Sequence, residues 1–211
     1  MTLHKCIIKV QQGDLTQGDS LVLVNASNTN GILGAGVSAA ISRTCGKELQ
    51  TTITNALTKK FVGPMQPGDI LITDAGKHPK AQFVAHVAVM DYRQGFNVDP
   101  FPTVQTIKLC CQNLWQTLEQ LQADKITVAM VALGASTGQL GVRFPTEIAC
   151  ETLKAHLNSN TQSKIGEVTF YGYQPHEYTI MLEIISKQPT LIPKVTENLL
   201  AASQKVTLAH H

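Results

Sequence analysis

The sequence predicts an α/β protein in which helices cover both faces of a central, mixed sheet of about six strands. Three observations support this prediction. Short apolar runs of strand length recur along the chain, and segments with apolar residues at helical spacing lie between many of them. Clusters of Gly, Asn, Asp and Pro separate the segments and mark loops. Strands that alternate with helices favour a layered architecture.

The strands are predicted from apolar runs rich in Val, Ile and Leu, which suit buried positions in a sheet. The first run is expected to pair antiparallel at one edge, which would make the sheet mixed. The six runs cover residues 6–10, 21–24, 70–72, 83–89, 126–133 and 168–171.

The helices are predicted from apolar spacing and from residues typical of helix ends. Pro145 suits the first turn of a helix, where its missing N–H is not needed. Gly, Asn, Asp and two Pro residues predict a loop over residues 95–102. The expected helices cover residues 37–41, 48–59, 103–121, 146–157 and 177–186.

Length and composition indicate one globular domain. The chain has 211 residues, of which 43% are hydrophobic, enough to bury one sizeable core. Residues 1–187 are predicted to form this domain. Residues 188–211 are predicted to form a C-terminal extension, in which residues 195–205 can form one helix docked on the domain.

Charge and cysteine usage narrow the class of protein. The net charge of +2 gives no sign of a dedicated nucleic-acid binder. The five cysteines fit neither a zinc site nor a disulfide framework, so we expect buried free thiols in a reducing compartment. With no signal peptide and no apolar run of membrane-spanning length, we expect a cytoplasmic protein, or a nuclear one in a eukaryote. The sequence indicates no metal or cofactor, and the oligomeric state stays open.

The most informative segment begins at the end of the second apolar run. Asn25 and Asn28 can each donate and accept hydrogen bonds, which suits hydroxyl recognition. Gly31, Gly34 and Gly36 follow, and glycines let the backbone approach a ligand closely. The helix expected directly behind them would present free N–H groups and the positive end of its dipole to an anion. This chemistry suits a sugar phosphate.

Three motifs in this order resemble the macro domain, the ADP-ribose-binding family, over about residues 3–186. They are Gly13-Asp14-Leu15-Thr16, then Asn25-Ala26-Ser27-Asn28 with Gly34-Ala35-Gly36-Val37, and finally Ser136-Thr137-Gly138-Gln139-Leu140-Gly141. The resemblance implies a three-layer α/β/α fold and an ADP-ribose site.

The resemblance also implies roles for single residues. Asp14 would accept a hydrogen bond from the adenine amine, Asn25 would hold the loop, and Asn28 would reach the distal ribose. Backbone N–H groups of residues 136–139 would bind the diphosphate. Either Tyr171 or Tyr173 would stack on adenine, and Tyr171 is the residue we choose. The expected catalytic residues are Asn28 and Ser38. The expected ligand-binding residues are Asp14, Leu15, Asn25, Ala26, Asn28, Gly34, Ala35, Gly36, Val37, Ser136, Thr137, Gly138, Gln139, Leu140 and Tyr171.

The chain departs from the family pattern at three positions. One large hydrolytic branch carries an Asp where this chain has Ser38, and a serine hydroxyl is a poor general base near neutral pH. Leu140 replaces a bulky aromatic residue, and Ala35 replaces a loop glycine. These departures weaken the expectation of catalysis more than that of binding.

Each motif also has a purely structural interpretation. Asp14 can cap a turn, and the amides of Asn25 and Asn28 can brace one. His86, in an apolar strand, is expected to be a satisfied core histidine rather than a base. Tyr171 can simply pack in the core.

Two other enzyme classes fit the motifs less well. The glycines do not follow the Gly-x-Gly-x-x-Gly order of a dinucleotide fingerprint. Residues 134–138 match Gly-x-Ser-x-Gly, with Ser136 as the nucleophile of an esterase. That motif requires a helix directly after the serine, whereas the sequence predicts a loop.

The leading hypothesis is therefore a protein that binds ADP-ribose and hydrolyses an ADP-ribosyl ester or a related conjugate. Mono-ADP-ribosylated protein and O-acetyl-ADP-ribose are the conjugates considered. The alternative is a reader module that binds ADP-ribose without turnover. A third option is weak binding of RNA or poly(A), against which the near-neutral charge argues.

Overall fold

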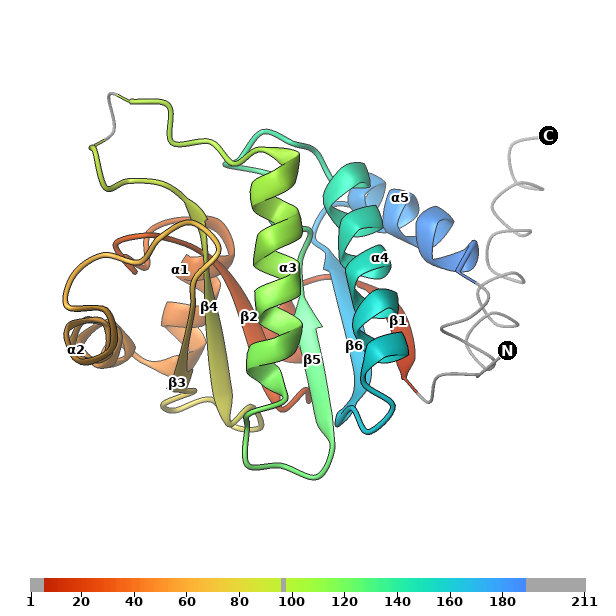
Figure 1. Ribbon diagram of the computed structural model, residues 1–211, viewed down its shortest axis with the longest axis horizontal. Helices are drawn as coiled ribbons and strands as arrows, with labels where there is room; N and C mark the ends of the chain where they lie inside the picture. The colour runs from red at the N-terminus through yellow and green to blue at the C-terminus, as the bar shows by residue number, and fades with distance from the viewer. Residues whose placement is uncertain (1–5, 96–97, 189–211) are drawn as a thin grey trace.

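The computed structural model describes residues 6–95 and 98–188, which form a six-stranded sheet flanked by helices (Figure 1). Along the sheet the strands follow the order β1-β6-β5-β2-β4-β3. Every predicted strand is present, and the sheet is mixed, as predicted. The bounds are β1 Ile7–Gln12, β2 Val22–Asn28, β3 Ile70–Asp74, β4 Phe83–Met90, β5 Ile126–Met130 and β6 Ile165–Gly172.

The prediction that the first strand pairs antiparallel is wrong. β1 lies at one edge, as expected, but it runs parallel to β6. The antiparallel strand is β3, at the opposite edge, where it pairs with β4. The connections explain the difference. Residues 75–82 are a short link that turns β3 back into β4, whereas residues 13–21, with the 3₁₀ helix η1 (Leu15–Gln17), cross back along the sheet to the start of β2.

The local sequence supplies a capping side chain or a first-turn proline at the starts of α3, α4 and α5. The hydroxyl of Thr103 accepts a bond from the Thr106 N–H and starts α3, and Pro175 occupies the first turn of α5. Pro145 lies in the first turn of α4, as predicted. The bounds are α1 Gly36–Cys45, α2 Leu49–Phe61, α3 Val104–Leu118, α4 Arg143–Ser159 and α5 Pro175–Ser186.

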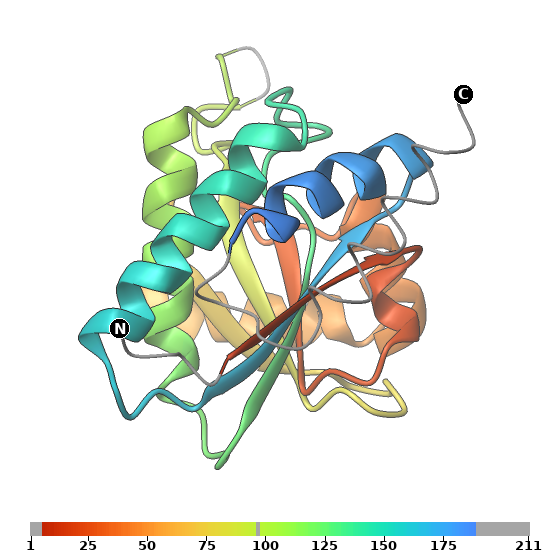
Figure 2. The ribbon, with the colours of Figure 1, turned by 90° about the vertical axis from the view of Figure 1, so that its right-hand side faces the viewer.

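Helices cover both faces of the sheet (Figures 1 and 2). An apolar core lies on each face. The larger core packs α3, α4 and α5 against one face around the fully buried Trp115, whose indole N–H donates to Thr152. The smaller core packs α1, α2 and η1 against the other face. Alternation along β2 divides its side chains accordingly, with Val22 and Val24 in the larger core and Leu23 in the smaller. The three-layer arrangement is as predicted.

The described residues confirm the expectation for the cysteines. All five cysteines are free and buried, and burial raises the pKa of the Cys6 and Cys110 thiols to about 12. None of the helices in the described residues combines the length and the apolar character that crossing a bilayer requires. The helix expected over residues 195–205 lies outside the described residues.

Candidate functional site

The motifs meet at the edge of the sheet where the parallel strands end. β2 and β5 are neighbours, and the loops behind them are residues 29–35 and 131–142. From β2 the chain continues into α1 and α2 on one face, whereas from β5 it continues into α4 on the other. Ligands of open α/β sheets bind at such a switch point, outside the carboxyl ends of the strands. The fold therefore brings both glycine-containing motifs to the position where a ligand is expected.

The strand β2 is longer than its apolar run. The predicted strand ends at residue 24, but Asn25 and Asn28 also lie within β2. β2 pairs with β5 only through Val22 and Leu23, so residues 25–28 extend past that pairing and are paired with β4 alone. On the side of β5 this segment therefore has no strand partner among the described residues, and β5 itself ends at Met130.

Asn28 braces the loop that follows β2. Its Oδ1 accepts from the N–H groups of Asn30 (3.1 Å) and Ile32 (3.2 Å), and its Nδ2 donates to the Ile32 carbonyl (2.9 Å). An amide oxygen has two lone pairs and an amide nitrogen two hydrogens. In this conformation Asn28 therefore retains one N–H for a ligand and no acceptor.

Gln50 holds the same loop and was not found by the sequence analysis. From α2, its Oε1 accepts from the Leu33 N–H at 2.8 Å, and its Nε2 donates to the Gly31 carbonyl at 3.0 Å. It lies 17 residues from Leu33, and a glutamine on a predicted helix carries no signal for such a contact.

The helix α1 begins without a capping side chain. Its N-cap is Ala35, and Gly34, Ala35 and Gly36 are exposed. In the described part of the chain, the N–H groups of residues 35–38 donate to no protein acceptor. Free N–H groups at the positive end of a helix dipole attract an anion.

The loop behind β5 presents a second row of free N–H groups. Those of Ser136, Thr137 and Gly138 have no acceptor among the described residues. The Gln139 N–H, expected to face the ligand, donates instead to the Ser136 carbonyl at 2.9 Å. Leu140 packs partly against the larger core.

Two backbone features hold this second loop in its shape. A Cβ on Gly138 would lie 2.5 Å from the Gly134 carbonyl oxygen, so only glycine fits there. Gln139 has φ 62°, a left-handed conformation that non-glycine residues rarely adopt. Such strain clusters at ligand-binding segments. No helix follows Ser136 directly, since α4 begins at Arg143, so the structural context of an esterase elbow is absent.

A buried chain of hydrogen bonds links β3, β4, β2 and α1. Ser38 donates to Asn25 Oδ1 at 2.8 Å, Asn25 Nδ2 lies 3.0 Å from His86 Nδ1, and His86 Nε2 lies 3.0 Å from Thr73 Oγ1. Asn25 and His86 have no exposed surface and are direct partners in the β2–β4 register. Burial lowers the pKa of His86 to about 3, so the ring is neutral. His86 is thus a satisfied core histidine, as predicted.

Asp14 and Leu15 lie at the end of β1. One oxygen of the Asp14 carboxylate accepts from the Thr16 N–H (2.9 Å) and hydroxyl (2.8 Å), which caps η1. The other oxygen has no partner among the described residues. Asp14 is half-buried, whereas Leu15 belongs to the smaller core.

The aromatic residues near this end differ in exposure. Tyr171 is only 5% exposed, and its hydroxyl fills the space where a Cβ of Gly18 would lie. Tyr173, just beyond the end of β6, is 68% exposed. Stacking of Tyr171 on adenine stays a prediction.

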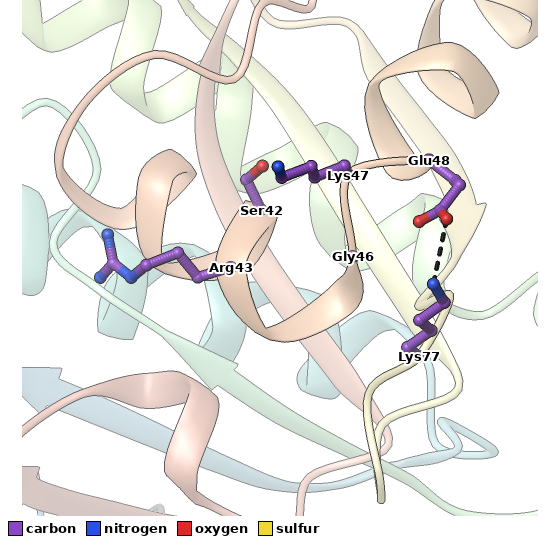
Figure 3. Close-up of a pocket in the computed structure, with 6 residues that line it drawn as sticks. All are labelled: Ser42, Arg43, Gly46, Lys47, Glu48 and Lys77. Carbon is purple, nitrogen blue, oxygen red and sulfur yellow. Dashed lines mark hydrogen bonds and ion pairs between the residues drawn. The ribbon is translucent and has the colours of Figure 1, made fainter.

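A depression lined mostly by polar and charged residues lies at the other end of α1, away from the glycine loop (Figure 3). Its lining comes from the last turn of α1, the link to α2 and Lys77, which pairs with Glu48 at 3.0 Å. None of the predicted site residues lines it; the lining residues are Ser42, Arg43, Gly46, Lys47, Glu48 and Lys77.

Known proteins resemble this chain over most of its length. An O-acetyl-ADP-ribose deacetylase of Cronobacter turicensis is 30% identical over 185 residues, which cover 85% of this chain and 96% of the relative. A macro domain-containing protein of Listeria monocytogenes is 25% identical over 185 residues, covering 86% and 98%.

Solved structures show the same fold. A macrodomain of Oceanobacillus iheyensis with ADP has a TM-score of 0.73 at 19% identity, covering 91% of this chain and 96% of its own. The Trypanosoma brucei macrodomain in complex with ADP-ribose has a TM-score of 0.69 at 20% identity, covering 84% and 68%. The profile of the macro domain matches residues 24–153. The chain therefore belongs to the macro domain family.

Proposed function

We propose that this protein binds ADP-ribose along the edge where the parallel strands end and hydrolyses an ADP-ribosyl ester or a related conjugate. The observation that supports binding most directly is that two neighbouring segments each present consecutive backbone N–H groups without a protein acceptor among the described residues. They are residues 35–38 and residues 136–138. One row starts α1 and the other lies in the loop behind β5, on neighbouring strands at the switch point. Two such rows suit the two phosphates of a diphosphate.

The order of the strands indicates which end of the ligand would lie at which end of the site. β1, β6, β5 and β2 are successive neighbours, so the edge runs from Asp14, behind β1, to Asn28, at the end of β2. Adenine would lie at the Asp14 end, where one carboxylate oxygen can accept from its amine. The diphosphate would lie between the two N–H rows, and the distal ribose beside Asn28 and the glycine loop.

Hydrolysis would depend on placing the distal ribose rather than on a strong base. The Ser38 hydroxyl is directed at Asn25 and stays protonated near neutral pH. The free N–H of Asn28 can hold a ribose hydroxyl, and a water together with the ligand's phosphate would complete the reaction. Mono-ADP-ribosylated protein and O-acetyl-ADP-ribose are the proposed substrates; the deacetylase of Cronobacter turicensis supports the latter.

A reader that binds ADP-ribose without turnover is the second candidate. The observation that favours it is the hydrogen bond from Ser38 to Asn25 inside the protein. Ser38 stands at the position where one large hydrolytic branch of the family carries an Asp. A reader would retain binding and show no release of the conjugated group.

Calorimetry with ADP-ribose and with AMP tests the binding proposal. We expect ADP-ribose to bind more tightly, because only ADP-ribose supplies a diphosphate and a second ribose. Asp14→Ala should weaken binding by about 1–3 kcal/mol, the range for hydrogen bonds to charged groups. Equal affinities for the two ligands would overturn the proposal.

Single-turnover release from an ADP-ribosylated acidic side chain tests catalysis. Asn28→Ala should reduce the rate more than Ser38→Ala, because a misplacement of about 1 Å can lower a rate about a hundredfold. Asn28→Asp is the matched variant: one oxygen can still accept from the Asn30 and Ile32 N–H groups, while the donor to the Ile32 carbonyl and to the ribose is lost. Thermal melts verify that the variants fold. A larger loss in Ser38→Ala would contradict the assigned roles, and binding without turnover in the parent would identify a reader.

A further inference from the structure

The series of buried hydrogen bonds from Thr73 through His86 and Asn25 ends at Ser38, in the first turn of α1. This turn carries one of the two sets of free backbone N–H groups. Ser38 is the third residue of α1, and its hydroxyl is fixed to Asn25 in the middle of β2. α1 has no capping side chain to set the position of this turn. The bond from Ser38 to Asn25 is therefore a specific polar restraint on the segment whose N–H groups face the ligand.

The position of Asn25 depends in turn on His86. Asn25 Oδ1 is taken by Ser38, so its Nδ2 is the donor in the 3.0 Å contact with His86 Nδ1. His86 Nδ1 must then be the acceptor, and the ring proton lies on Nε2, which donates to Thr73 Oγ1. In each of these three hydrogen bonds the donor therefore lies on the Ser38 side and the acceptor on the Thr73 side.

We propose that His86 is a positioning residue of the ADP-ribose site, which acts through Asn25 and Ser38 to fix the first turn of α1. This inference rests on the proposed function. His86 has no exposed surface, so it is placed to act through Asn25 and Ser38 rather than through direct contact with a ligand. Its effect should fall on the diphosphate and the distal ribose, which lie against α1, and not on adenosine, which lies at the other end of the edge.

Two substitutions of His86 separate this role from packing. In His86→Asn, the side-chain oxygen replaces Nδ1 and can still accept from Asn25, while the bond to Thr73 is lost. In His86→Gln, the terminal amide replaces Nε2 and can still reach Thr73, while the acceptor for Asn25 is lost. Gln fills more of the imidazole volume than Asn, so packing alone predicts that His86→Asn is the more damaging change. The positioning role predicts the opposite order for ADP-ribose binding.

The experiment measures the affinities of ADP-ribose and AMP by calorimetry for the parent and both variants, beside a thermal melt of each. We expect His86→Gln to reduce the ratio of the two affinities about tenfold, equivalent to about 1.4 kcal/mol. His86→Asn should retain the parent ratio, and AMP affinity should stay unchanged in both. If His86 had a purely structural role, its substitution would lower the affinities of ADP-ribose and AMP by the same factor.

Two further variants apply if a His86 substitution prevents folding. Ser38→Ala removes the hydrogen bond from Ser38 to Asn25 and leaves the His86 ring in place. It should lower the ratio of ADP-ribose affinity to AMP affinity as His86→Gln does. Thr73→Val removes only the hydrogen bond between Thr73 and His86 Nε2 and should leave the ratio of the two affinities unchanged. Equal ratios in the parent, His86→Gln and Ser38→Ala would overturn the positioning role alone. If the parent binds ADP-ribose no better than AMP, the proposed function fails, and the positioning role fails with it.

Discussion

Acidification from about pH 7.5 to about pH 4.5 should destabilise this protein through His86. The ring is buried and neutral, and burial lowers its pKa to about 3. In the unfolded chain a histidine titrates near pH 6.5. Between these two values the unfolded state binds a proton that the folded state does not, so the free energy of unfolding decreases as the pH falls.

The magnitude follows from the two pKa values. Each pH unit in this window is worth about 1.4 kcal/mol, so the two units from pH 6.5 to pH 4.5 remove about 2.7 kcal/mol. Domains of this size are stable by only about 5–15 kcal/mol, so the loss is large. Carboxylates whose pKa is lowered in the folded state, such as Glu183 and Asp91, add their own losses mainly below about pH 4.5, near their unfolded pKa.

Urea denaturation of the parent and of His86→Gln across this range measures the effect. His86→Gln lacks the titrating ring, so its stability should fall less steeply between about pH 6.5 and about pH 4.5. Comparing slopes removes the constant cost of the lost ring and the contribution of the other histidines. Identical slopes in the two proteins would refute the assignment of this pH dependence to His86.

Three further predictions concern single side chains. Ser27→Ala should raise the free energy of unfolding by about 1 kcal/mol in a thermal melt, because the Ser27 hydroxyl is the one buried side-chain polar atom without a partner in the described residues; a lower stability would contradict this. Gly138→Ala should weaken ADP-ribose binding in calorimetry, because its Cβ would lie 2.5 Å from the Gly134 carbonyl oxygen and shift the loop; unchanged affinity would count against the second N–H row. Gln50→Ala should speed hydrogen exchange at the Leu33 amide, which loses its acceptor, whereas unchanged protection would mean that the loop holds itself.

The strand and helix pattern was largely predictable from the sequence, because it depends on local periodicity. Each predicted strand and helix in residues 6–95 and 98–188 is found near its expected position. The ends of some strands differ from the predicted ones where neighbouring strands or turns, rather than local composition, decide where a strand stops. Polar residues Asn25 and Asn28 continue β2 because β4 supplies their backbone partners. Conversely, the run over residues 126–133 stops as a strand at Met130, where the turns behind β5 begin.

The direction of β1 and the partners of the site amides could not be predicted in this way. An apolar run has no intrinsic preference for parallel or antiparallel pairing, and the choice depends on how the connection crosses the sheet. His86 and Asn25 are 61 residues apart, so their bond exists only because β2 and β4 are neighbours in the given register.

The sequence by itself determined the layered α/β class and the three motifs, because backbone propensity, apolar periodicity and glycine placement act over a few residues. Only the tertiary structure decided which N–H groups are free and which polar side chains are consumed inside the protein. It brings the loops behind β2 and β5 to one edge, commits Ser38 to Asn25 and uses the oxygen of Asn28 to brace its own loop. A hydrogen bond depends on the positions of both partners, and for partners distant in sequence those positions are set by strand order and packing.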